Sequence, residues 1–220
     1  MASELAAKTA PEVQSEGLSK GVRTRNRILD LTYDSVIRKG FAATSIEELV
    51  EAAGITKSGF FYHFRDKNDL ARRLIERYTA ENEVFLDGLI GRARELSDDP
   101  LHSYLIFLKL FAEAMSEVFA VHPGCLVAII TFQDQAFDRT IGAMNSEGVM
   151  AWRRRFLSWL EQIAEAYPPR VSVDLPAMAD NALMYAYGGA MLSKTLAQPE
   201  LLARQILFYR DTVRLVFAPR

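Results

Sequence analysis

The sequence has little cysteine and no long apolar run, and each shortage excludes a class of protein. The single cysteine, Cys125, rules out a disulfide within the chain. No apolar run approaches the roughly 18–20 residues that a membrane-spanning helix needs. The N-terminal stretch, residues 1–17, lacks the basic start and apolar segment of a secretory signal. Together these shortages predict a soluble protein of the reducing cytoplasm.

The chain also has almost no excess of acidic over basic residues, since its 220 residues carry a formal net charge of only −2. Such a balance is unusual for a protein whose whole surface binds nucleic acid. The charge is uneven, however, because Leu18 to Lys67 contains nine Lys/Arg and six Asp/Glu, which gives +3 and leaves −5 for the rest. A basic head on an acidic body suits a protein that presents one end to DNA.

The residues that are present predict an all-α chain. Half of them are apolar, which is enough for substantial cores. Glycine and proline are sparse over long stretches, and strand-like alternation is missing. Residues 1–19 show no periodicity and are expected to form a flexible arm. Helices are expected at residues 24–39, 45–53, 57–64, 67–89, 101–120, 124–136, 138–166, 175–197 and 200–217.

Two short helices are expected to meet at a glycine turn between residues 45 and 64. Ser45, or Thr44 one residue earlier, is followed three positions later by glutamate, which is the spacing of a capping box. Gly54 can take the left-handed conformation that a tight turn requires, and Thr56 can cap the second helix. A second helix this short can enter a DNA major groove, which is about 12 Å wide. The pattern therefore predicts a helix-turn-helix.

The stretch from Ile28 to Leu70 resembles the TetR family of one-component transcriptional regulators. It shares with that family a Gly-aromatic turn, a Thr-Ser pair before the second helix, an Ala-Gly-aliphatic turn and a recognition helix that ends in Phe-Tyr-His-Phe. The resemblance covers about the first third of the chain, and the body resembles the family in general plan. The matching residues are Gly40, Thr44, Ala53, Gly54, Lys57, His63, Phe64 and Lys67.

The resemblance implies an all-α fold with two domains of different function. An N-terminal three-helix helix-turn-helix domain at residues 20–67 would bind DNA, after a flexible arm at residues 1–19. Residues 68–220 would form a helical ligand-binding and dimerisation domain. In the family the last two helices pair with their copies in a second subunit, and such a homodimer reads the two half-sites of a palindromic operator.

The resemblance also implies which residues touch double-stranded DNA. Thr44 and Ser45 would meet backbone phosphate at a helix N-terminus. Arg23 and Arg25 in the arm are candidates for the DNA flank. Family members often carry Tyr at the position of Phe61, which can contact a thymine methyl but cannot donate to phosphate. The implied DNA-binding residues are Thr44, Ser45, Thr56, Lys57, Ser58, Gly59, Phe61, Tyr62, His63 and Lys67.

The body is expected to hold an effector. In the family a ligand pocket lies among the body helices, and the large amphipathic side chains of this chain favour a hydrophobic or aromatic small molecule. No cofactor is expected. A metal site is not expected either, because His102 and His122 have no second ligand at metal-binding spacing. The candidate ligand-binding residues are Phe107, Phe111, Gln133, Trp152, Phe156, Met184 and Tyr187.

The sequence therefore predicts a DNA-binding transcription regulator, and within that class a repressor that a small ligand releases by swinging the helix at residues 67–89. Two alternatives stay open. One is a regulator without a small ligand, acting as an activator or under the control of a partner protein. The other is a redox or electrophile sensor acting through Cys125, whose competing interpretation is a small buried apolar residue. An all-α enzyme is disfavoured, because no nucleophile–base pair, metal spacing or phosphate loop is visible.

Overall fold

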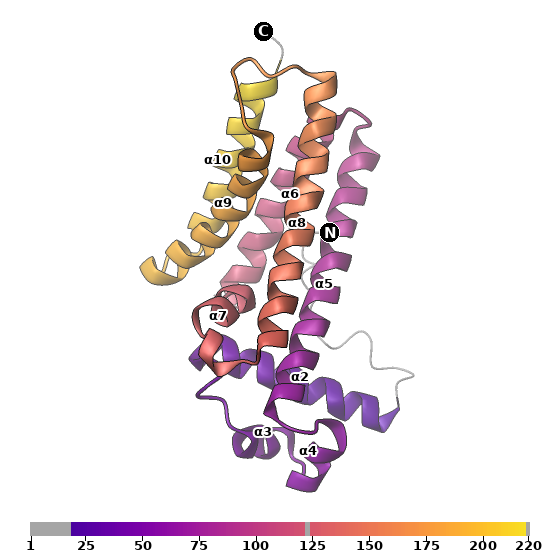
Figure 1. Ribbon diagram of the computed structural model, residues 1–220, viewed down its shortest axis with the longest axis vertical. Coiled ribbons are helices and arrows are strands. Elements are labelled where there is room, and N and C mark those ends of the chain that lie inside the picture. Colours follow the sequence, from indigo (N-terminus) through magenta and orange to yellow (C-terminus); the bar gives the residue numbers. More distant parts are fainter. Residues whose placement is uncertain (1–18, 122–123, 219–220) are drawn as a thin grey trace. The chain divides into compact units, whose positions relative to one another are not determined.

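The computed structural model describes residues 19–121 and 124–218, which form helices joined by short loops (Figure 1). This part of the chain contains no strand, and the predicted all-α fold is confirmed. No helix within the same residues is both long and apolar enough to cross a membrane. The elements are α2 (Lys20–Lys39), α3 (Ile46–Ala53), α4 (Lys57–His63), α5 (Lys67–Leu96), α6 (Pro100–Val121), α7 (Leu126–Phe132), the 3-10 turn η1 (Asp134–Ala136), α8 (Arg139–Ala166), α9 (Leu175–Leu196) and α10 (Glu200–Phe217).

The chain divides into two compact units, which we call the head unit and the body unit. The head unit contains the described residues up to Glu81 together with Cys125–Glu147. The body unit contains the described residues of Asn82–Gly124 and Gly148–Arg220. The functional division at residue 67 that the sequence predicts is a different boundary, and it stays a prediction.

Helix α2 begins earlier than the sequence suggests, at Lys20. The reason is a local cap, because the Ser19 hydroxyl accepts the N–H of Val22 at 3.4 Å and so satisfies a free donor of the first turn. The assignment of Arg23 and Arg25 to a flexible arm was therefore wrong, since both lie on α2. Residues 1–18 of the predicted arm lie outside the described residues.

Three local features set the helix-turn-helix, and the sequence predicted each of them. The Ser45 hydroxyl caps α3 by accepting the N–H of Glu48 at 3.2 Å. Gly54 ends α3 in the left-handed conformation, with φ 65° and ψ 39°. The Thr56 hydroxyl then caps α4 by accepting the N–H of Gly59 at 3.1 Å. The turn and the starts of both helices are thus fixed by residues within a dozen positions of one another.

The core of the head unit joins the helix-turn-helix to the later segment at residues 125–147. Phe41, Phe60 and Phe64 are each at most 1 % exposed. They belong to the same apolar cluster as Leu126 and Ile130 of α7. A small helix-turn-helix buries little apolar surface by itself, so this second segment adds core that the first lacks.

The single helix predicted at residues 124–136 was wrong. The structure has α7 there, then η1, with Gln133 between them. Gln133 Oε1 accepts the N–H of Phe41 at 3.2 Å, across 92 positions of sequence. The helix therefore ends where a side chain makes a distant contact, which local periodicity does not reveal.

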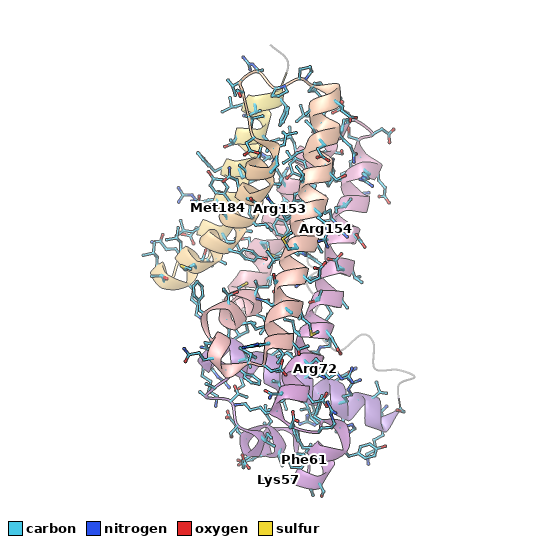
Figure 2. All side chains as sticks on the ribbon, in the orientation of Figure 1. Lys57, Phe61, Arg72, Arg153, Arg154 and Met184 are labelled. Atoms are coloured by element: carbon cyan, nitrogen blue, oxygen red, sulfur yellow. The ribbon has the colours of Figure 1, made fainter. Side chains whose placement is uncertain are left out.

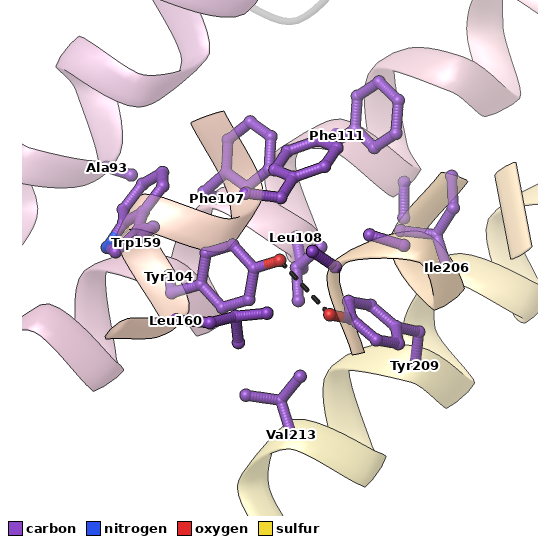
Figure 3. Close-up of a cluster of buried hydrophobic side chains, with 14 of the residues drawn as sticks. Ala93, Tyr104, Phe107, Leu108, Phe111, Trp159, Leu160, Ile206, Tyr209 and Val213 are labelled. Atoms are coloured by element: carbon purple, nitrogen blue, oxygen red, sulfur yellow. Dashed lines mark hydrogen bonds between the residues drawn. The ribbon is translucent and has the colours of Figure 1, made fainter. Parts of the chain in front are cut away.

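The body unit is built around aromatic side chains of α6, α8 and α10 (Figure 3). Tyr104 and Tyr209 are almost fully buried, with their hydroxyl oxygens 3.4 Å apart, and Tyr209 donates to the carbonyl of Met178 at 2.9 Å. The buried hydroxyls therefore have partners. A Cβ on Gly189 would lie 3.1 Å from Leu202 Cα, so α9 and α10 approach closely at that glycine. The ends of α6, α8, α9 and α10 agree with the predicted ranges to within one residue.

Candidate DNA interface

An exposed surface on α3, α4 and the turn between them carries most of the residues implied in DNA binding. We call it the reading surface. Phe61 is 45 % exposed and Tyr62 is 83 % exposed. Adjacent exposed aromatic side chains are typical of a binding surface. Figure 2 shows Lys57 and Phe61 on the same short helix, α4. The exposed side chains of the reading surface belong to Ser45, Thr56, Lys57, Ser58, Phe61 and Tyr62.

The opposite side of α4 is anchored in the core of the head unit. Phe60 is fully buried and Phe64 is 1 % exposed, with their ring centroids 5.5 Å apart. Because residues four positions apart share a helical face, this anchoring turns Lys57, Ser58 and the exposed aromatic pair outward. Gly59 is half-buried, and a Cβ there would lie 3.3 Å from the capping oxygen of Thr56. A side chain at that position would therefore press on the start of α4.

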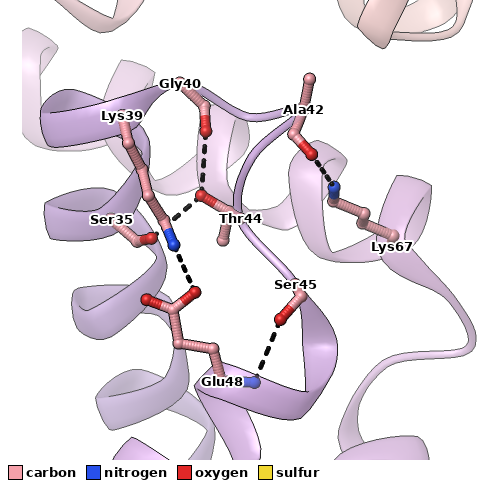
Figure 4. A network of polar contacts seen from close by, with 8 residues as sticks. All are labelled: Ser35, Lys39, Gly40, Ala42, Thr44, Ser45, Glu48 and Lys67. Carbon is pink, nitrogen blue, oxygen red and sulfur yellow. Dashed lines mark hydrogen bonds and ion pairs between the residues drawn. The ribbon is translucent and has the colours of Figure 1, made fainter.

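The structure does not bring the Thr44 side chain to the reading surface. Thr44 is fully buried, and its hydroxyl donates to the Gly40 carbonyl at 3.0 Å and shares a second hydrogen bond with the Ser35 hydroxyl at 3.0 Å (Figure 4). Its backbone N–H donates to the carbonyl of Phe41 at 3.1 Å. Thr44 thus fixes the end of the α2–α3 turn and positions Ser45, the exposed residue that follows it.

Two carboxylates in the first turn of α3 pair with lysines of the neighbouring helices. Glu48 is paired with Lys39 at the end of α2 (Figure 4), and Glu47 accepts from Lys57 Nζ at 2.7 Å. These hydrogen bonds lower the pKa of both carboxyl groups below the ordinary value, so both are ionised at neutral pH. The partners lie nine and ten positions away across turns, outside any helical spacing.

Lys67 begins α5 and lies over the same α2–α3 turn. Its Nζ donates to the carbonyl of Ala42 at 3.3 Å and lies 4.6 Å from the centroid of the Phe41 ring. Partial burial and the charge of Lys39 lower the pKa of Lys67 below its ordinary value. The ammonium is therefore already placed by a carbonyl and an aromatic face, close to residues that precede Ser45.

His63 ends α4, and Arg25 reaches the same region from α2. The Arg25 guanidinium lies 5.9 Å from the centroid of the Phe64 ring, next along the chain from His63. Partial burial, and then the charge of Arg25, lower the pKa of His63 below 6.5. The imidazole is consequently neutral at neutral pH, although a phosphate placed beside it would favour the charged form.

Gln133 lies in the head unit, apart from the other ligand-binding candidates, which belong to the body unit. In addition to its bond to Phe41, its amide lies 2.5 Å from where a Cβ on Gly40 would stand, and Gly40 has a φ of +85°. An open pocket of about 460 Å³ adjoins this contact. It is lined by Ala42, Phe132, Gln133, Gln135 and Ala136.

Four of the ligand-binding candidates come together in the core of the body unit. The Phe107 and Phe111 rings stack with centroids 5.8 Å apart, and Trp152 lies 6.1 Å from Phe111 and from Phe156. The remaining two candidates are on α9, where Met184 is 65 % exposed and Tyr187 is half-buried. The structure thus groups the aromatic candidates of α6 and α8 and leaves Met184 on the surface.

Cys125 immediately precedes α7 in the head unit. Burial raises the pKa of its thiol above 9.0, although the N–H groups of Ala128 and Val127 oppose this shift. Because the thiolate is the nucleophile, such a thiol reacts slowly at neutral pH. This favours the interpretation of Cys125 as a small apolar residue over that of a sensor.

Comparison with known proteins points to one class. The sequence pattern described as "Bacterial regulatory proteins, tetR family" matches residues 28–74. The chain is 25 % identical over 179 residues to the transcriptional regulator AcuR of Cereibacter sphaeroides, covering 76 % of this chain and 77 % of AcuR. It is also 25 % identical over 127 residues to the HTH-type transcriptional repressor KstR2 of Rhodococcus jostii, covering 58 % of this chain and 56 % of KstR2. Both relatives are regulators of transcription.

The fold agrees with that class. A crystal structure of a TetR-family transcriptional regulator from Agrobacterium tumefaciens is similar with a TM-score of 0.75 at 18 % identity, covering 90 % of this chain and 100 % of that one. The fold and the reading surface define a helix-turn-helix regulator of transcription. The match at residues 28–74, the regulators among its relatives and the shared fold support the TetR family of bacterial regulatory proteins. It is accordingly a DNA-binding regulator and not an enzyme.

Proposed function

We propose that the chain is a repressor that binds a palindromic operator as a homodimer and that a small hydrophobic or aromatic molecule releases it. The observation that carries the DNA-binding part is the reading surface. A short helix anchored by Phe60 and Phe64 presents cationic, hydroxyl and aromatic side chains to solvent. A helix of this length fits a major groove, and two copies related by a two-fold axis would read two half-sites.

The proposed contacts with DNA are of two kinds, those to base edges within the major groove and those to the phosphate backbone. Thr56, Lys57 and Ser58, at the start of α4, would meet base edges together with the backbone at Gly59. Phe61 would pack on a thymine methyl. The residues that would contact backbone phosphate are Ser45, Tyr62, His63 and Lys67. Thr44 would act only by positioning Ser45.

The homodimer would form through α9 and α10. Both helices expose large apolar side chains, and exposed apolar groups gathered on adjacent helices indicate an interface. Residues of this kind are Met184, Met191, Leu192, Leu196, Phe208 and Leu215. The close approach of the two helices at Gly189 would make them one rigid face for the second subunit.

The effector would bind in the body unit near the aromatic side chains of α6 and α8. Stacked rings favour a flat or apolar molecule. Ligand release would act by population shift, in which a coupling of about 1–3 kcal/mol weakens DNA binding roughly 5- to 150-fold. Repression is supported by the resemblance to KstR2, and the site of action would be the cytoplasm, where bacterial DNA lies.

The test is selection of duplexes from a random-sequence library with the purified protein, followed by affinity measurements on the selected duplex. We expect a palindromic site, a bound dimer, and a loss of about tenfold or more for Lys57→Ala. Lys109→Ala is the matched control, because Lys109 is an exposed lysine of α6 in the body unit. Equal affinities for the two variants would contradict the role of α4. A site that no compound of a broad ligand screen releases would favour the alternative without a small effector.

A further inference from the structure

Lys57, which the proposed function places at base edges, is paired with a negatively charged side chain. Its Nζ is 2.7 Å from Glu47 Oε1, and the two side chains are 62 % and 69 % exposed. Exposed ion pairs of this kind contribute little to folding stability. A carboxylate beside a DNA-binding lysine also repels phosphate, so the pair weakens general attraction to DNA. Glu47 therefore lowers general affinity for DNA and adds little to the stability of the fold.

We propose that Glu47 is a specificity-determining residue and that the Glu47–Lys57 pair reads one G·C base pair in each half-site. The inference rests on the proposed binding of operator DNA. It adds to that proposal an acidic residue of α3 that makes base contacts jointly with the recognition helix.

The chemistry of the pair matches the major-groove edge of a G·C pair. An ammonium group has three N–H donors, and only one is needed for Glu47, so two remain for guanine O6 and N7. The second carboxylate oxygen of Glu47 can accept from the N4 amino group of the paired cytosine. Guanine is the base that presents two adjacent acceptors in this groove, which distinguishes G·C from A·T for this pair.

On DNA of arbitrary sequence, the two charges of the Glu47–Lys57 pair cannot both keep a hydrogen-bonding partner. If Lys57 moves to a phosphate, it exchanges one anion for another and leaves Glu47 without its partner beside a negatively charged backbone. At the matched base pair, by contrast, both charges keep a hydrogen-bonding partner. Glu47 is therefore expected to lower affinity for arbitrary sequences more than affinity for the operator, which raises their ratio.

The chain offers a matched control for removal of this charge. Glu51 lies on the same helix one turn later, is exposed, and is not the partner of Lys57. Glu47→Gln and Glu51→Gln change the net charge equally. Library selection with each protein should show the wild-type preference for G·C at one position of each half-site. That preference should fall roughly 5- to 150-fold in Glu47→Gln, the worth of one good base contact, and persist in Glu51→Gln.

Affinity for a random duplex supplies an independent readout. In Glu47→Gln the freed Lys57 can neutralise a phosphate, so the slope of log affinity against log salt should become steeper by about 0.9 per subunit. The slope of Glu51→Gln should match the wild type. Lys57→Gln should lose the same G·C preference as Glu47→Gln, and the double variant should lose no more.

The outcomes separate the two proposals. If the wild type selects no sequence, operator binding itself fails, and the role of Glu47 fails with it. If the wild type selects a site and both glutamate variants keep its preferences and salt slopes, or change them equally, the role of Glu47 is overturned while operator binding stands.

Discussion

Among single residues, His63 is the one on the proposed interface whose charge can change near neutral pH. Partial burial and the charge of Arg25 hold its pKa below 6.5, so the free protein carries a neutral imidazole. The neutral imidazole therefore stabilises the folded state relative to the protonated one. This stabilisation is lost as pH falls below the pKa that His63 has in the unfolded chain. A DNA phosphate would act in the opposite direction, because an adjacent anion raises the pKa of an imidazole.

DNA affinity should consequently rise as pH falls from about 7.5 to 5.5, since binding takes up a proton at His63. Each protonated imidazole should also steepen the salt dependence by about 0.9 per subunit. His63→Gln should bind with the same salt slope at both pH values. His102→Gln, on α6 of the body unit, is the control and should behave as the wild type does. A wild-type slope that does not change with pH would place His63 away from phosphate.

Cys125 offers a second prediction at this scale. Because burial raises the pKa of its thiol above 9.0, alkylation of the native protein at pH 7 should be much slower than that of a small free thiol. Cys125→Ser should bind operator DNA with wild-type affinity, before and after treatment with an electrophile. Release of DNA by the electrophile from wild type but not from Cys125→Ser would restore the sensor hypothesis.

Among the elements, η1 and the turn after α2 are joined by Gln133. Its Oε1 accepts the N–H of Phe41, and the ring of Phe137 stacks on Phe41 with centroids 4.5 Å apart. Asp138, the next residue, forms an ion pair with Arg72 of α5, in which Oδ2 and Nη2 are 3.7 Å apart. Residues from the later segment of the head unit thus brace the turn that leads into Ser45 and the reading surface.

Gln133→Ala should therefore destabilise the protein by about 1–3 kcal/mol, because the backbone N–H of Phe41 loses its acceptor. Gln135→Ala, an exposed glutamine of η1 two positions later, should change stability by less than about 0.5 kcal/mol. Denaturant titration of both variants measures the difference. If the two titrations coincide, the Gln133 bond does not hold the turn.

The elements also show what could be predicted from the sequence. Caps and the glycine turn act within a few residues, so Ser45, Gly54 and Thr56 were identified correctly. The early start of α2 was missed, although Ser19 three residues before Val22 is a local signal for it. The break at Gln133 depends on a partner 92 positions away, which periodicity does not contain.

The candidate site followed the same rule. The family resemblance implied the residues of α4 in DNA binding, and Lys57, Ser58, Phe61 and Tyr62 among them are exposed. The burial of Thr44 was not predicted, since it depends on a tertiary contact with Ser35. The pairing of Glu47 with Lys57 was also missed, because it forms across the turn and at no helical spacing.

At the scale of the whole molecule, the proposed recognition of a palindromic operator requires a second copy of the chain. Phe208 of α10 is 60 % exposed, and it packs against Tyr185 of α9 with ring centroids 5.8 Å apart. A charge placed there would be buried without a partner in the proposed dimer. Phe208→Glu should therefore yield monomers and lower operator affinity at least tenfold, since one half-site carries little binding energy.

Val84→Glu is the control for that variant, because Val84 of α5 in the body unit is 74 % exposed and lies outside α9 and α10. Light scattering of both proteins measures the mass in solution. A dimer that persists in Phe208→Glu would show that another surface joins the subunits.

Dimethyl sulfate footprinting of a selected duplex tests most directly whether α4 reads the major groove, because the reagent methylates guanine N7, which lies there. We expect protection of guanines in two clusters related by two-fold symmetry, with centres one or more helical turns of about 34–36 Å apart. Lys57→Ala should lose protection in both clusters. A duplex bound tightly without protection of any guanine N7 would contradict recognition by α4.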